Sequence, residues 1–93
     1  MSHPRTERLV APFRQAASAY LESPAVLTGM ELDEVAGQLK QAAASELQDD
    51  TLVELLHQCL KCVREGDAGR VRDLIGAVGE QLGTHGLGNP TAP

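Results

Sequence analysis

The chain has 93 residues and a formal net charge of −5, and 42% of its residues are apolar. This length provides for one small domain with a single core, and the apolar content is too high for a fully disordered chain. With one Phe, one Tyr and no Trp, the predicted core is thin and aliphatic, which favours association with another protein or with a homodimer mate.

Charge is distributed unevenly along the chain. Residues 1–20 contain Arg5, Arg8 and Arg14, whereas the only base in residues 21–50 is Lys40, among many acidic residues. Binding to phosphates requires clustered Lys and Arg, so the acidic middle argues against nucleic acid as a partner. This middle segment is typical of a solvated acidic face, and it would also suit a basic protein surface.

Membrane and secretory signals are missing from the sequence. No apolar run reaches the ~18 to 20 residues that are needed to span a bilayer. The first ten residues lack the apolar core of a signal peptide. We therefore expect a cytoplasmic protein without membrane contact, whose two cysteines are reduced.

Helical periodicity recurs four times, and strand patterns are almost absent. The first apolar stripe lies within residues 4–21, where Pro12 interrupts it. An internal proline removes a hydrogen bond and clashes with the preceding turn. We therefore expect a secure helix from Pro12 and a loosely ordered lead-in over residues 1–11, with one longer helix kinked at Pro12 as the alternative.

The second and third helices are predicted over residues 29–45 and 51–65. Thr28 followed by Glu31 is a capping-box pattern, which predicts that Thr28 caps the second helix after a connector that begins at Glu22. Asp50 is the predicted N-cap of the third helix, and Thr51 is a competing one.

The third helix has the widest apolar face of the four, which covers about half of its circumference. A face of this width contacts more than one neighbour, so we expect the helix to be central to the bundle or to an interface. Part of this face is a candidate partner-binding surface. Its residues are Leu52, Leu55, Leu56 and Leu60.

Gly66 is predicted to end the third helix and Asp67 to cap the fourth, so that the short turn forms an antiparallel hairpin over residues 51–82. The fourth helix carries glycines on the side opposite its narrow apolar stripe. Interior glycines destabilise a helix, so this bare face either admits a partner helix or is merely tolerated at the surface. The candidate contacts there are Arg72, Gly76 and Gly79.

Cys59 and Cys62 form a Cys-x-x-Cys pattern within the apolar face of the third helix. They lie away from a helix N-terminus, where the dipole would favour the thiolate, and the spacing of the histidines does not complete a zinc site. We expect both cysteines to pack in the core. No nucleophile is paired with a base by spacing, so no catalytic residue, cofactor or metal is expected.

The sequence predicts an all-α protein, a small up-and-down bundle of three to four helices that ends in an antiparallel hairpin. A single domain covers residues 1–83, and residues 84–93 are expected to form a disordered tail. The expected function is a non-catalytic protein–protein interaction module, such as an adaptor, a sequestering regulator or a chaperone-like partner. The alternative is a thiol-based redox or metal-responsive sensor that uses Cys59 and Cys62.

Overall fold

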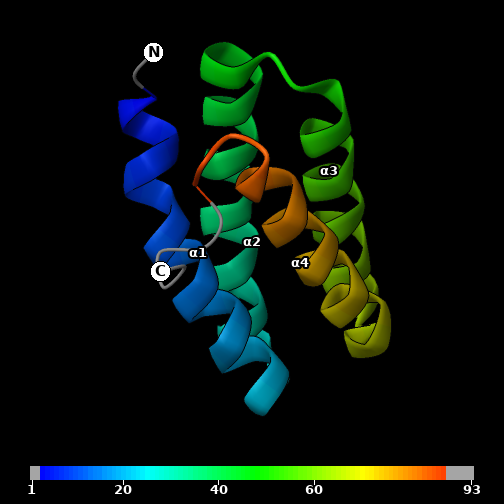
Figure 1. Ribbon diagram of the computed structural model, residues 1–93. Helices are drawn as coiled ribbons and strands as arrows, with labels where there is room; N and C mark the ends of the chain where they lie inside the picture. Colours follow the sequence, from blue (N-terminus) through cyan, green and yellow to red (C-terminus); the bar gives the residue numbers. More distant parts are fainter. Residues whose placement is uncertain (1–2, 88–93) are drawn as a thin grey trace.

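The computed structural model describes residues 3–87, which form four α-helices joined by short connections (Figure 1). Within these residues there are no strands, and successive helices run in opposite directions, which confirms the predicted all-α up-and-down bundle. One π-helical turn follows the second helix directly. The elements are α1 (Pro4–Glu22), α2 (Val26–Ala42), η1 (Ala43–Leu47), α3 (Asp50–Glu65) and α4 (Ala68–Gly83).

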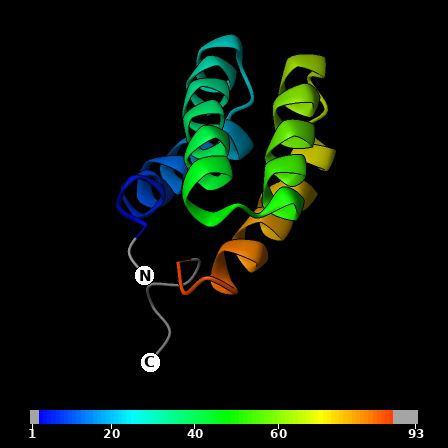
Figure 2. The ribbon, with the colours of Figure 1, turned by 90° about the horizontal axis from the view of Figure 1, so that it is seen from above.

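Each helix packs mainly against its neighbours in the chain, and α1 contacts α4 only sparsely. Seen from above, α2 and α3 lie together on one side of the molecule, and α1 and α4 lie on the other (Figure 2). The core between these pairs is aliphatic apart from Phe13 and Tyr20. The α2–α3 pair therefore turns one side to the core and leaves the other side uncovered.

The first helix starts at Pro4, where the sequence predicted a loosely ordered lead-in as far as Pro12. Pro4 occupies the first turn, where the missing N–H has no helical partner in any case. Pro12 lies inside the helix on its exposed side. The helix continues through Pro12, and its first turn is held by another part of the chain.

Glu46 of η1 provides that support. Its carboxylate accepts hydrogen bonds from the backbone N–H groups of Arg5, at 3.1 Å, and Thr6, at 2.8 Å, and from the Thr6 hydroxyl at 2.8 Å. These bonds also satisfy the fully buried Thr6 side chain. Burial opposes ionisation of Glu46, but the bonds from Thr6 and Arg5 outweigh it and lower the pKa of the carboxyl.

The second helix begins at Val26, three residues before its predicted start. Thr28 is therefore its third residue and not its cap. The Thr28 hydroxyl accepts a hydrogen bond from the backbone N–H of Ala25 at 3.0 Å. It also donates to the Ser23 carbonyl oxygen at 2.9 Å. The predicted connector is therefore shorter, and Val26 becomes part of the surface of α2.

Asp49, and neither Asp50 nor Thr51, is the N-cap of α3. One of its carboxylate oxygens accepts the backbone N–H of Leu52 at 3.1 Å, which satisfies a free donor at the start of the helix. At the other end, Gly66 adopts a φ of +75° and ends α3, as the sequence predicts.

The second carboxylate oxygen of Asp49 reaches the end of α4. It accepts a hydrogen bond from the Gln81 side chain at 2.7 Å and lies 2.8 Å from Nε2 of His85. Residues 84–87 therefore form an attached turn, in which the Leu87 N–H bonds to the Leu82 carbonyl oxygen at 3.0 Å. The sequence predicted a disordered tail here, and the rest of that prediction, residues 88–93, lies outside the described residues.

The Asp49 contacts predict how stability depends on pH. The hydrogen bonds from Gln81 and His85 lower the pKa of Asp49 from 3.8 to about 2. Because the folded-state pKa is depressed, the stabilisation is present above pH 3.8 and is lost as the pH falls through about 2. We expect Asp49→Asn to lower the free energy of unfolding by about 1 to 2 kcal/mol at neutral pH, measured by urea denaturation.

The difference between the wild-type chain and Asp49→Asn should shrink as the pH falls from 4 towards 2, since both side chains are then uncharged. Asp50→Asn is the matched control because Asp50 is an exposed carboxylate next to the cap. If both variants lost the same stability, the Asp49 contacts would not be the cause.

Candidate functional site

The large apolar side chains that the structure leaves exposed gather at the start of α2. Val26, Leu27 and Met30 expose 79%, 74% and 62% of their surface. Apolar surface of this kind gains about 25 cal/mol for each Å² that a contact removes from water. Neighbouring exposed apolar side chains in a protein this small are typical of an interaction surface.

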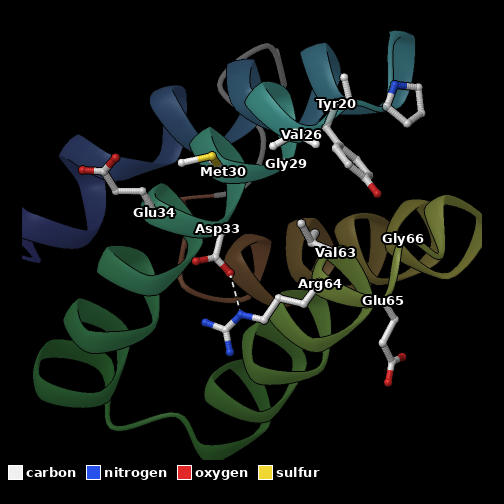
Figure 3. Close-up of a pocket in the computed structure, with 12 residues that line it drawn as sticks. Tyr20, Val26, Gly29, Met30, Asp33, Glu34, Val63, Arg64, Glu65 and Gly66 are labelled. Carbon is white, nitrogen blue, oxygen red and sulfur yellow. Dashed lines mark hydrogen bonds and ion pairs between the residues drawn. The ribbon is translucent and has the colours of Figure 1, made fainter.

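An open groove of about 750 Å³ lies beside this patch, between the start of α2 and the end of α3 (Figure 3). Val26 and Met30 line it from α2, and Arg64 lines it from α3. Tyr20, near the end of α1, and Gly29 lie at its base, and both are buried in the bundle. Three helix ends therefore form the groove together.

Gly29 lies where α2 contacts α1 and α3, at the base of the groove. A Cβ atom at this position would lie 3.5 Å from the Tyr20 ring and 3.6 Å from a Val63 methyl group. Both are ordinary van der Waals distances, so a methyl side chain fits here and the helix contact does not depend on glycine.

An ion pair crosses from one wall of the groove to the other. Nε of Arg64 donates a hydrogen bond to a carboxylate oxygen of Asp33 at 3.1 Å (Figure 3). The Arg64 side chain is 69% exposed, so the pair stabilises the fold by at most about 1 kcal/mol. It links the two walls and leaves the apolar part of the groove accessible.

A second cavity of about 390 Å³ follows between α2 and α3, towards the other end of the pair. Nζ of Lys40 lies 3.5 Å from Nδ1 of His57 there. Arg64 and Glu65 line both cavities, which are therefore adjacent, and we refer to the two together as the α2–α3 trough. The trough is defined by Val26, Met30, Asp33, Glu34, Lys40, His57, Lys61, Arg64 and Glu65.

The leucine face that the sequence predicted as a partner surface lies in the core. Leu52 and Leu56 are fully buried, Leu60 is 7% exposed, and only Leu55 is half-buried. The face is wide because α3 packs against both α2 and α4. Leu52 and Leu56 therefore contact only the chain's own helices, whereas Leu55 keeps part of its surface and Leu60 lines the second cavity between α2 and α3.

The glycine face of α4 lies on the outside of the bundle, as predicted. Arg72 and Gly76 are exposed, and Gly79 is half-buried. A Cβ atom at Gly76 or Gly79 would meet no atom within 4 Å. The described chain therefore does not use this bare backbone for a close helix contact, and contact with a partner stays a prediction.

Cys59 and Cys62 are free thiols, and both are buried. Burial, together with the neighbouring Cys62, raises the pKa of Cys59 to about 11. The thiolate is the reactive form of cysteine, and burial disfavours it. Their environment is that of packing residues and does not favour the redox or metal-sensor alternative.

The described residues contain neither a metal-binding cluster nor a membrane-spanning helix. Within residues 3–87, no group of three or more His, Cys, Asp or Glu side chains is placed to hold a metal ion. No helix in this range combines the length and the apolar character that crossing a bilayer requires. The His85–Asp49 pair holds the end of α4 to the start of α3 and is used in the fold.

The chain matches no family model, and comparisons with curated proteins and with solved structures give no match. The fold and the site therefore define its class, a small all-α bundle with an open trough between its two central helices.

The groove was not predicted from the sequence, because Val26 and Leu27 fall in the segment predicted to be a connector. A usable signal was present. Positions 26, 30, 33, 37 and 40 recur at alternating spacings of four and three, which places them along one side of a helix. Since this stripe is mixed in polarity, a search for apolar periodicity does not find it.

Thiol chemistry tests the assignment of the cysteines. At pH 8, a thiol with a pKa of about 11 is ionised in roughly one molecule in a thousand, so Cys59 should react slowly with a disulfide reagent. We expect labelling in the native protein to accelerate steeply when urea populates the unfolded chain. Rapid labelling of either thiol without denaturant would instead restore the redox interpretation.

The glycines of α4 give a second expectation. Replacing Gly76 and Gly79 by alanine should stabilise the protein by about 2 kcal/mol in total, because alanine is the better helix former and the added methyl groups meet open space. Urea denaturation of the double variant measures this. A loss of stability would show that this face is packed more closely than the structure indicates.

Proposed function

We propose that the chain is a small protein–protein interaction module that receives its partner in the α2–α3 trough. The observation that carries the proposal is the exposure of Val26, Leu27 and Met30 next to an open groove. A bound partner would remove this apolar surface from water, which favours association. The proposal gives the chain a binding role of the adaptor or regulator kind, without a catalytic step.

The charges around the groove favour a protein over other partners. Glu34 and Glu65 line the groove, and Glu31 is exposed on the same helix as the patch. At this end of the trough Arg64 is paired with Asp33, so these carboxylates repel the phosphates of nucleic acids and of anionic lipid surfaces.

The shape of the trough favours a different protein over a second copy. Two identical grooves that face each other are both hollow, so neither would fill the other. A two-fold axis through the middle of the trough would also place Val26 and Met30 opposite Lys40 and Lys61, against a charged surface. A partner with a protruding apolar element fits better.

The test is to capture partners with the tagged protein, identify a stoichiometric one, and measure its dissociation constant for purified variants. Met30→Asp should weaken binding by at least about tenfold, since it places a charge on the proposed contact. Met30 is 62% exposed, so the substitution should leave the fold intact, which circular dichroism checks.

Two control variants locate the contact. Ala11→Asp introduces the same charge on an exposed position of α1 outside the trough and should leave the affinity unchanged. Gly76→Ala with Gly79→Ala alters the outer face of α4 and should also leave it unchanged. If Met30→Asp bound normally while the glycine variant bound poorly, the partner surface would be on α4 and the proposal would fail.

A further inference from the structure

If the proposed function is correct, the spacing and length of the residues along the α2–α3 trough indicate the shape of its occupant. Positions 26, 30, 33 and 40 of α2 line the trough, and position 37 lies on the same side of the helix, so that the spacings alternate between four and three. Helices that pack side by side present residues at this spacing to one another. From Val26 to Lys40 the stripe is about 21 Å long, which matches a partner helix of about four turns.

Gly37 lies towards the Lys40 end of this stripe, between Asp33 and Lys40. It is half-buried, and a Cβ atom placed on it would meet no atom within 4 Å. The stripe therefore has a vacant position one turn before Lys40, flanked by longer side chains on the same helix. A side chain of a partner helix can enter such a position, as knobs enter holes between packed helices.

The charges of the trough differ between its two ends. Near Val26 and Met30, Glu34 provides negative charge, and Arg64 is already paired with Asp33. Glu65, in the last turn of α3, lines this end and also the second cavity. Beyond the Arg64–Asp33 pair, Lys40 and Lys61 provide positive charge. An occupant with uniform charge would be repelled at one of the two ends.

We propose that the occupant is an amphipathic helix of a partner protein, with acidic residues in its first turn over Lys40 and Lys61 and basic residues in its last turn near Glu34 and Glu65. Acidic first turns and basic last turns also suit the dipole of the partner helix itself. This arrangement sets the helix antiparallel to α2, with its apolar side chains against Val26 and Met30 and one of them at Gly37.

Two synthetic peptides of about sixteen residues test this inference, because a helix of that length covers the stripe. Both carry the same leucine stripe and the same composition. One has glutamates in the first turn and lysines in the last, and the other has these charges exchanged. Their affinities for the full chain are measured by fluorescence anisotropy at low and at high salt.

The peptide with acidic residues first should bind about tenfold more tightly at low salt, because charge pairs at both ends replace repulsions, and the preference should shrink at high salt.

The exchanged peptide is intrinsically less helical, so a variant protein provides the control. Lys40→Glu, Lys61→Glu, Glu34→Lys and Glu65→Lys together keep the net charge of −5 and should invert the preference. Should this variant fold poorly, Lys40→Gln with Lys61→Gln should reduce the preference several-fold.

The outcomes separate this inference from the proposed function. If both peptides bound equally, and Met30→Asp abolished both, the trough would be a binding site without the inferred polarity, and this inference would be overturned alone. Absence of binding by either peptide at high concentration would overturn the helical occupant. The proposed function itself depends on the captured partner and its response to Met30→Asp.

Discussion

Two carboxylates in the connection between α2 and α3 hold one end of the bundle together. Glu46 caps the start of α1, and Asp49 caps the start of α3 and binds Gln81 and His85 at the end of α4. Because α2 continues directly into η1, all four helices are fixed at this end. At the opposite end, the turns are held by local hydrogen bonds, and the groove opens there.

This difference between the two ends accounts for how a thin core coexists with an exposed apolar patch. The start of α2 contacts α1 and α3 at Gly29, but Val26 and Met30 lie outside this contact and stay uncovered. A partner bound there would add the packing that the chain does not supply, and it would stabilise the folded state by mass action. Stability and binding then depend on different ends of the same helices.

The helices could be predicted from the sequence because their apolar periodicity and the caps at Gly66 and Asp67 are local signals. The start of α1 could not, since its cap, Glu46, is forty residues away from Thr6. The tie between Asp49 and His85 is equally remote in sequence. The trough escaped prediction for a related reason. Exposure is a property of the assembled fold, and periodicity identified Leu52 and Leu56 as apolar without showing that α2 and α4 cover them.

The rings of His3 and His85 lie edge to face, with their centroids 6.4 Å apart. The two ends of the described chain therefore meet at the end of the bundle that Glu46 and Asp49 fix, away from the groove. A short linker can join them, and new ends can be opened in the turn at Ser23 and Pro24 without cutting a helix. Such a circularly permuted chain would keep the helix contacts but place its free ends beside the groove, where a fused domain would obstruct it.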